Sequence, residues 1–327
     1  MPPETLDHAH TSPTRRGRMR LAAGVLFTAM TLVASALVGR KFSHTSWPLE
    51  HAPLGLVICA AVSYFASYVF RALGWQKLFP ATARPDRARC LAACGAAAAS
   101  GVVLPFRLDY LVKIGTLRKL GGVKLGLEAI VLSIISLGLV DAVAFLPLSV
   151  SATATSSSTF RIPLICVVAF GLFSCGLLVA GRHLMDFGFV ARRPRLMKLA
   201  RRVADHPRGS TRDAIAAWFF LFGCWGTRAL GSTCLLAALG VGFSPTLALV
   251  VLCLTAAAAL IPIASGGAVA NVGATAAVLL ALGVHGGQAI NFSLASGLLL
   301  CGTAAAAAMV GTATSLAIRL RTHLATA

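Results

Sequence analysis

Charged side chains inside long apolar segments are the residues of this sequence that could do chemistry. Asp141 lies in SLGLVDAVAFLP with apolar neighbours on both sides, and Arg228 lies in CWGTRALG in the middle of another apolar run. A charge in an apolar, membrane-like environment is costly, so such residues usually face an opposite charge, a substrate or an ion. We therefore expect Asp141 and Arg228 to form an ion pair. Two roles stay open for this pair: a fixed link between two helices, or a pair that opens when an anionic or zwitterionic group competes for it.

A second group of charges follows a proline in LPFRLDYLVKIGTLRK, residues 104–119. Pro105 interrupts a helix because it has no backbone N–H. Arg107, beside this break, has the planar guanidinium that binds a phosphate through two parallel hydrogen bonds. If the following residues are helical, Asp109 and Lys113 are one turn apart and can pair on one face. The segment is either a binding site for an anionic group or a solvated basic collar.

A third candidate site is the apolar run ALIPIASGGAVANVG, which contains Pro262, Ser265, Gly266, Gly267 and Asn271. Within lipid, non-helical backbone survives only where protein or a water-filled cavity satisfies its N–H and C=O groups. We therefore expect the segment PIASGG to form the tip of a hairpin that lines such a cavity, with glycines that allow a ligand to approach closely. An ordinary helix kinked by its proline is the alternative.

The composition places these segments in a membrane. Of the residues, 57% are hydrophobic and 12% are charged, whereas soluble domains have about 25% charged residues. The net charge of +19 comes from short Lys/Arg clusters between apolar runs, which is where membrane proteins carry them. No basic patch is interleaved with aromatic residues as in proteins that bind single strands, so we exclude nucleic acid as a partner. The chain is predicted to be an integral membrane protein.

Motifs of soluble enzymes are absent from the sequence. The nine cysteines form no CxxC pair and no Cys/His spacing typical of metal sites. The sequence also has no HExxH, GxSxG or phosphate-binding loop motif. We therefore predict no metal site, no cofactor and no enzymatic activity. A membrane-embedded transferase, the alternative from the enzyme class, would have only Asp109 and Asp141 as acid–base groups.

Six apolar runs are long enough to cross a membrane, which takes about 20 residues. They are 21–39, 53–70, 126–148, 161–181, 214–239 and 288–313. Residues 1–20 form a polar N-terminal tail with a basic end. The sequence ASA at 34–36 could pass as a signal-peptide cleavage site, but the apolar run is longer than a usual signal-peptide core. We therefore expect the run to be kept as the first helix.

Two further apolar regions, 90–120 and 246–283, are each broken by a proline. The arm before each proline has about fifteen residues, or about 22 Å of helix, against a membrane core of about 30 Å. Cytoplasmic segments are rich in Lys and Arg. The cations after the first proline stay inside only if 90–120 enters from the cytoplasm and returns, and the basic C-terminus stays inside only if 246–283 enters from outside. Both regions are therefore predicted to be re-entrant hairpins.

This topology puts both termini in the cytoplasm, together with the basic loop 182–213, and it puts the uncharged segment 149–160 outside. The cytoplasmic segment after the span 53–70 contains the cations Arg71, Lys77, Arg84, Arg87 and Arg89. Because Lys and Arg collect on the cytoplasmic side of membrane proteins, the chain is predicted to be a multi-pass protein of the cytoplasmic (plasma) membrane.

The two halves, 53–148 and 214–313, then share the layout span–hairpin–span in opposite orientations. Inverted repeats of this kind form substrate sites near the middle of the membrane, where broken helices meet. The predicted fold is an all-α polytopic membrane protein with about six full transmembrane helices and two proline-broken re-entrant hairpins in an inverted-repeat arrangement. A single membrane domain spans 21–317, and a cytoplasmic tail, 318–327, follows it.

These motifs resemble those of the flippase-like membrane domain of lysylphosphatidylglycerol synthases and of its stand-alone relatives. That family has a hairpin of the form Leu-Pro-x-Arg-x-Gly-Glu-x-x-Arg, a span with a buried acid, and a later Pro-x-x-Pro-Gly-Gly hairpin. The first motif is matched by Leu104, Pro105, Arg107 and Lys113, with Asp109-Tyr110 in place of Gly-Glu. The buried acid is matched by Asp141, and the last motif by Pro262, Ser265, Gly266 and Gly267, with Asn271 near the place of a family glutamate.

The resemblance implies movement or binding of a lipid with a polar headgroup. Nothing of length follows residue 317, so the aminoacyl-transferring domain of the full synthases is not expected and lysyl transfer is not implied. We predict a translocase for a membrane lipid or lipid-linked intermediate with an anionic or zwitterionic headgroup. The alternatives are a small-solute permease, the embedded transferase, and a scaffold for a partner membrane enzyme. The candidate substrate-binding residues are Pro105, Arg107, Asp109, Lys113, Asp141, Arg228, Pro262, Ser265, Gly266, Gly267 and Asn271.

Overall fold

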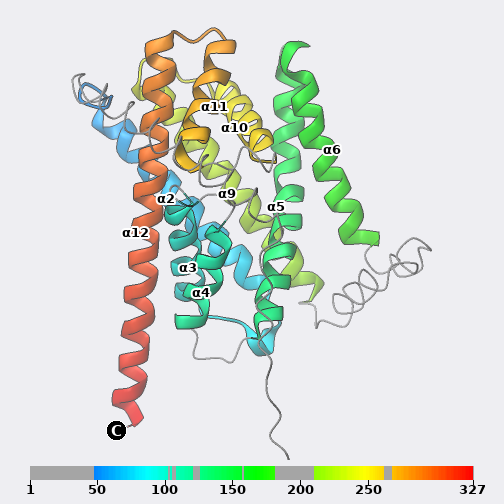
Figure 1. Ribbon diagram of the computed structural model, residues 1–327, viewed down its shortest axis with the longest axis vertical. Coiled ribbons are helices and arrows are strands. Elements are labelled where there is room, and N and C mark those ends of the chain that lie inside the picture. The colour runs from blue at the N-terminus through cyan, green and yellow to red at the C-terminus, as the bar shows by residue number, and fades with distance from the viewer. Residues whose placement is uncertain are drawn as a thin grey trace, which may run out of the picture. The chain divides into compact units, whose positions relative to one another are not determined.

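The computed structural model describes residues 48–101, 104, 108–120, 126–156, 158–180, 210–260 and 267–326. Every regular element in these ranges is helical (Figure 1), which confirms the all-α prediction for this part of the chain. The described helices belong to one compact unit, Trp47–Ala327. The expected first span, 21–39, and most of the basic loop 182–213 lie outside the described residues.

Five of the described helices are long and apolar enough to cross a membrane. They are α2 (Leu54–Lys77), α5 (Leu127–Thr155), α6 (Ser158–Ala180), α9 (Thr211–Ala238) and α12 (Gly286–Thr326). Each exceeds the roughly 20 residues that span a bilayer. The five helices coincide with the last five of the six expected spans, so the chain is a multi-pass membrane protein.

Three helix ends differ from the expected boundaries. α2 continues to Lys77, so Arg71 lies inside the helix and not in the segment after it. α5 continues past Pro147 to Thr155, so much of the expected loop 149–160 is helical. α12 includes most of the expected tail, 318–327. The apolar composition therefore predicts where the spans lie. The helices nevertheless continue past the charged residues and the proline near which we expected them to end.

Four shorter helices form two pairs. They are α3 (Arg87–Ser100), α4 (Asp109–Leu120), α10 (Pro245–Leu260) and α11 (Gly267–Ala281), and a single 3-10 turn, η1 (Ala81–Ala83), precedes α3. At 1.5 Å per residue these helices are about 18–24 Å long, less than the roughly 30 Å of a membrane core. α3 packs against α4, and α10 packs against α11. Pro105 and Pro262, between the paired helices, lie outside the described residues.

The pair α3–α4 begins and ends at one end of the helix assembly. Gln76, near the end of α2, donates a hydrogen bond to Pro85 O at 2.9 Å, just before α3 starts. The last residue of the pair is Leu120 of α4, and its carbonyl oxygen accepts a hydrogen bond from Arg319, which lies in the last part of α12. The chain therefore leaves α2, passes through α3 and α4, and returns to the same end.

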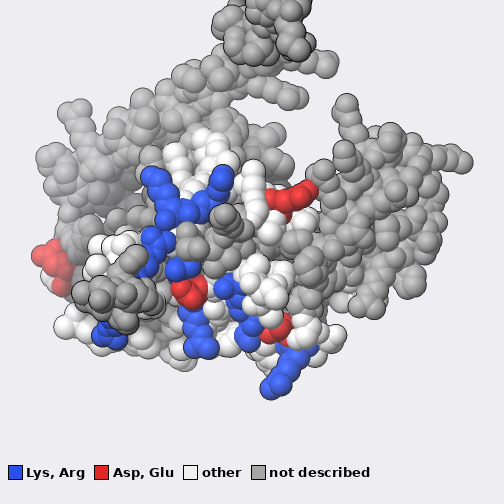
Figure 2. Space-filling view, turned by 90° about the horizontal axis from the view of Figure 1, so that it is seen from below, with Lys and Arg blue, Asp and Glu red and all other residues white. Residues whose placement is uncertain are grey.

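That end is basic. Asp213, in the first turn of α9, lies 3.3 Å from Lys77 Nζ and 2.9 Å from Arg84 Nη2. Ser210 caps α9 by accepting a hydrogen bond from the Asp213 backbone N–H, as serine at the N-cap position commonly does. Figure 2 shows this end from below, with Lys and Arg side chains gathered on it.

The pair α10–α11 begins and ends at the opposite end. Gln288, in the first turn of α12, donates to Gly240 O at 3.2 Å, so the start of α12 lies beside the end of α9. Gly240 and Gly283 have positive φ angles of 74° and 84° and end α9 and α11. The N–H after each glycine bonds back to a carbonyl of the last turn, the usual glycine-ended helix terminus.

The contacts made by helices α2–α5 are repeated by helices α9–α12. α2 packs along α9, α3 packs on α12, and α10 packs on α5. α2 also contacts α12, and α9 contacts α5. Exchanging α2 with α9, α3 with α10, α4 with α11 and α5 with α12 turns this set of contacts into itself. α6, which packs on α5 and α10, stands outside the exchange.

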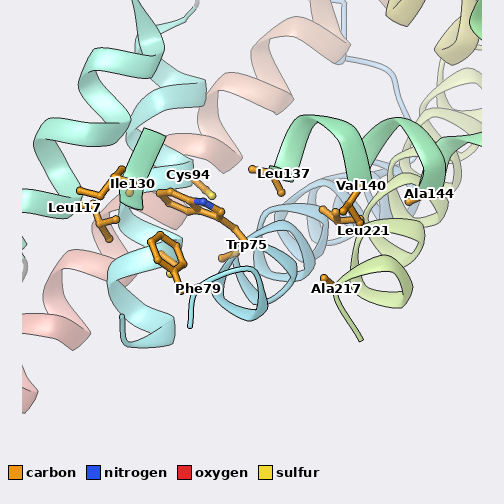
Figure 3. Close-up of a cluster of buried hydrophobic side chains, with 13 residues drawn as sticks. Trp75, Phe79, Cys94, Leu117, Ile130, Leu137, Val140, Ala144, Ala217 and Leu221 are labelled. Atoms are coloured by element: carbon orange, nitrogen blue, oxygen red, sulfur yellow. The ribbon is translucent and has the colours of Figure 1, made fainter. Parts of the chain in front are cut away.

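The largest buried cluster joins α2, α3, α4, α5 and α9. Trp75 of α2 and Leu221 of α9 are both fully buried in it. Figure 3 shows the Trp75 ring beside Cys94, and Val140 of α5 beside Leu221. Burial of such side chains stabilises helix packing and holds the polar residues of these helices in fixed positions.

Candidate functional site

The central polar contact of the described helices joins α2, α5 and α9. Arg71 Nη2 lies 2.7 Å from Asp141 Oδ2, and Trp225 Nε1 donates to Asp141 Oδ1 at 2.9 Å. The Arg71 and Asp141 side chains are only 26% and 11% exposed. Because one carboxylate oxygen accepts from Arg71 of α2 and the other from Trp225 of α9, Asp141 links all three helices.

The expected pairing of Asp141 with Arg228 is wrong. Arg228 Nε donates to Ser67 Oγ at 3.3 Å, and its Cζ lies 5.5 Å from the Tyr68 ring and 5.4 Å from the Trp225 ring. Aromatic faces attract a guanidinium at such distances. Within the described ranges, no carboxylate lies within ion-pair distance of Arg228. Asp141 instead takes Arg71, which lies nearer to it across the helix packing.

Lys113 of α4 is the third cation of this region, and it is buried, whereas Arg71 and Arg228 are half-buried. Lys113 is 5% exposed, and its Nζ lies 4.1 Å from the centre of the Trp75 ring. Trp75 is itself fixed by a hydrogen bond from Nε1 to Ser133 Oγ of α5, at 3.1 Å. Burial lowers the pKa of the Lys113 ammonium. No described carboxylate forms an ion pair with it, so the expected pair with Asp109 is not formed.

Arg71, Lys113, Asp141 and Arg228 make up what we name the buried charge cluster. It contains three cationic side chains and one carboxylate, so it has an excess of positive charge. Aromatic rings of Trp75, Tyr68 and Trp225 flank the cations. Such a site is suited to an anion, because an uncompensated buried cation is costly until a counter-ion neutralises it.

The structure brings together three of the candidate residues named from the sequence. These are Lys113, Asp141 and Arg228. Asp109 lies half-buried one turn before Lys113 in α4. Gly267 and Asn271 lie in the first turns of α11. The remaining candidates, Pro105, Arg107, Pro262, Ser265 and Gly266, lie outside the described residues.

Sequence reasoning missed Arg71, although a signal for it was present. The segment FASYVFRALG, 65–74, matches FGCWGTRALG, 222–231, at the phenylalanine, at an aromatic residue three positions on, and throughout RALG. Arg71 and Arg228 therefore hold the same place in two related segments. Arg228 stands in the middle of a long apolar run, whereas Arg71 directly follows the expected span 53–70, so the sequence predicts Arg71 in the segment after that span.

The two related segments also pack on each other in the same way. A Cβ added at Gly74 would lie 3.0 Å from Leu221 and 3.3 Å from Ala217 O. A Cβ added at Gly231 would lie 2.9 Å from Tyr64 and 3.2 Å from Ala60 O. Each glycine thus faces the residues ten and fourteen positions before the other glycine. α2 and α9 are therefore an antiparallel pair with a local two-fold relation.

Comparison with known proteins places nearly the whole chain in one family. The family model of the lysylphosphatidylglycerol synthase TM region matches residues 20–318. The match includes the buried charge cluster and every described helix up to the last turns of α12. No curated protein and no solved structure matches the chain.

Proposed function

The chain belongs to the family of the lysylphosphatidylglycerol synthase transmembrane region, and we propose that it moves a membrane lipid with an anionic headgroup between the two leaflets. The family supports a function connected with membrane lipids. The choice of a translocase that binds an anionic headgroup rests on the chemistry of the buried charge cluster.

One observation carries this proposal: three cations and only one carboxylate, Asp141, make up the buried charge cluster. The ion pair of Arg71 and Asp141 neutralises one cation. Lys113 and Arg228 remain without a carboxylate among the residues that the structure describes. Ionisable residues at membrane depth commonly mark substrate pathways. A headgroup with a negative charge would complete the cluster and be stabilised by it.

The helix arrangement supports an inverted repeat around this cluster. The exchange of α2–α5 with α9–α12 preserves the helix contacts, and the two RALG segments occupy matching positions. The short pairs α3–α4 and α10–α11 start from opposite ends, as two re-entrant hairpins of opposite orientation would. In transporters of this design, broken helices meet at a substrate site near the middle of the membrane.

The basic end is assigned to the cytoplasm. Lys77, Arg84 and Arg319 lie there, and Figure 2 shows how Lys and Arg gather at this end. Cytoplasmic faces of membrane proteins carry an excess of these residues. With this orientation the C-terminus is cytoplasmic, and the hairpin α3–α4 enters from the cytoplasmic side.

Transport is favoured over transfer chemistry by the state of Asp141. A general base must be able to accept a proton from its substrate. Both Asp141 oxygens already accept hydrogen bonds, one from Arg71 and one from Trp225, so both are engaged by the protein itself. Asp141 therefore fits a structural and electrostatic role within a binding site.

The experiment is a lipid-movement assay with the purified protein in vesicles. Fluorescently labelled phosphatidylglycerol is placed in both leaflets, and a membrane-impermeant reductant destroys the label that reaches the outer surface. The parent protein is expected to expose the inner pool, and the variant Lys113→Met with Arg228→Gln is expected to slow this exposure about tenfold or more. Arg118→Gln, a change at an exposed cation of the same α4 helix, serves as the matched control.

Two outcomes contradict the proposal. If the parent protein leaves the inner pool protected, as empty vesicles do, the chain does not move this lipid class. If the double variant moves the lipid as fast as the parent, the buried charge cluster is not on the lipid's path.

A further inference from the structure

Arg71 and Arg228 hold equivalent places in the two halves but have different partners. In one half, Trp225 donates to the Asp141 carboxylate of α5, which also binds Arg71. In the other half, the residue equivalent to Trp225 is Tyr68, and its hydroxyl donates to Leu300 O of α12 at 3.1 Å. The two aromatic donors therefore reach α5 and α12, one through the Asp141 side chain and the other through the Leu300 main chain.

Asp141 and Leu300 also occupy the same position along their helices. Asp141 is fourteen residues after Leu127, the first residue of α5, and Leu300 is fourteen residues after Gly286, the first residue of α12. Where one half has a carboxylate, the other has an aliphatic side chain. The two halves of the cluster thus differ in charge at this one pair of positions, Asp141 in α5 and Leu300 in α12.

Because Leu300 has no carboxylate, Arg228 has a different set of partners from Arg71. Its Nε donates to Ser67 Oγ, and this is the one hydrogen bond of its side chain to the described residues. Its two terminal nitrogens point to no acceptor there, while the Tyr68 and Trp225 rings lie within 5.5 Å of Cζ. A guanidinium held between aromatic faces keeps its planar fork available for an oxyanion.

We propose that Arg228 is the residue that binds the headgroup phosphate, whereas Arg71 stays paired with Asp141 and holds the site in shape. This inference rests on the proposed function and names the binding group and ligand chemistry of the same site. The ligand is a phosphate group with a net negative charge. Leu300 is the counterpart of Asp141 in the other half, and we expect an acid at this position to compete for Arg228 as Asp141 pairs with Arg71.

The test measures binding separately from movement. Isothermal titration calorimetry of the detergent-solubilised full chain uses dihexanoyl phosphatidylglycerol as the lipid probe and inorganic phosphate as the free-anion probe. Leu300→Asp is expected to weaken lipid binding about tenfold or more, because the introduced carboxylate competes for the guanidinium. Leu300→Asn has the size and polarity of the aspartate variant without its charge, so it should weaken lipid binding clearly less than Leu300→Asp does.

A relocation variant makes the test specific. In Asp141→Leu combined with Leu300→Asp, the cluster keeps its net charge, but the acid faces the other arginine. Lipid binding should return, and it should now be lost on Arg71→Gln and not on Arg228→Gln. Thermal unfolding of each variant without ligand checks that it folds.

Should an aspartate at position 300 prevent folding, Arg228→Gln and Arg228→Lys give the answer alone. Gln should lose lipid binding about tenfold or more, and Lys should lose less, since it keeps the charge without the fork. Wild-type affinity in Arg228→Gln, or in folded Leu300→Asp, overturns the inference.

The outcomes separate this inference from the proposed function. If the parent binds the lipid through Arg228 but does not move it between leaflets, the translocase proposal fails and the inference stands. If it binds inorganic phosphate and not the lipid, the proposed lipid substrate fails while Arg228 remains the anion site. If it binds neither probe, both are overturned.

Discussion

Arg71 Nη2 of α2 lies 2.7 Å from Asp141 Oδ2 of α5, and this contact sets the charge balance of the whole site. The pair is largely buried, so removal of one partner leaves the other charge without compensation. In soluble proteins such a loss costs about 3–5 kcal/mol, while removal of both partners is much milder.

We therefore predict strong coupling between positions 71 and 141. Arg71→Gln and Asp141→Asn should each lower the midpoint of thermal unfolding in detergent, and the double variant should lose clearly less than the sum. As a comparison, Arg228→Gln combined with Asp141→Asn should be closer to additive, because Arg228 is not ion-paired with Asp141. Additive losses at 71 and 141 would mean that the pair does not form in the membrane protein.

The close approach of α3 and α12 gives a prediction about packing. A Cβ added at Gly311 would lie 2.6 Å from Ala88 O and would also contact the Ala92 backbone, whereas Gly302, on the same helix, has nothing within 4 Å of an added Cβ. Gly311→Ala should therefore cost about 1–3 kcal/mol or more, since backbone cannot move aside as a side chain can. Gly302→Ala should be nearly neutral. Equal unfolding midpoints for the two variants would contradict the packing of α3 on α12.

The register of α2 against α9 can be tested through two thiols. Cys59 Sγ and Cys234 Sγ lie 3.3 Å apart across this helix pair. In a variant with the other seven cysteines replaced and a protease site inserted between α6 and α9, copper–phenanthroline oxidation should join the two cleaved halves on a non-reducing gel. Cys59→Ser should prevent the joining. Separate halves after oxidation of the cysteine pair would show that the register is shifted.

Lys113 predicts a pH dependence of anion binding. Because burial lowers its pKa, the ammonium loses its proton at a lower pH than an exposed lysine does. The side chain is charged below this pKa and neutral above it, so affinity for dihexanoyl phosphatidylglycerol should fall as the pH rises through it. Lys113→Met should bind more weakly at neutral pH and show a flatter profile. Lys119→Met, at an exposed position of α4, should keep the profile of the parent.

The proposed orientation is open to cysteine labelling. In a variant without the native cysteines, Ser156→Cys, at the end of α5, should react with a membrane-impermeant maleimide added outside the cell. Arg118→Cys, near the end of α4, should react only after the inside is exposed. External labelling at position 118 would contradict the cytoplasmic entry of the hairpin α3–α4.

Much of the fold could be predicted from the sequence, because the property that makes a segment a membrane-crossing helix is local to that segment. A membrane-crossing helix needs an apolar run of about 20 residues, and such a run can be identified without knowledge of its neighbours. The same holds for Asp141, since a carboxylate within an apolar segment is conspicuous in any fold. The prolines at 105 and 262 likewise indicated that two apolar regions would each be divided into shorter helices.

The helix ends were less predictable, because neighbouring helices decide them. Arg71 was expected beyond its span, since a cation beside an apolar run usually marks the membrane surface. The residue is helical and half-buried, because Asp141 neutralises its charge. Pro147 lies within α5 in a similar way, as membrane helices tolerate proline where neighbours and side chains satisfy the freed backbone group.

The sequence by itself determined that one acid, Asp141, and one arginine, Arg228, would lie within apolar helices. Only the tertiary structure decided that Arg71 lies within a helix too, and that Arg71 rather than Arg228 meets the acid. Arg71 and Arg228 stand in the same RALG context, so local sequence does not distinguish them. The register of α2 on α9, set by the close approach at Gly74 and Gly231, places Arg71 against Asp141 and Arg228 against Ser67. A shift of one helical turn, about 5.4 Å, would move either guanidinium out of ion-pair distance. Partner choice therefore depends on helix packing across the chain, which no single segment encodes.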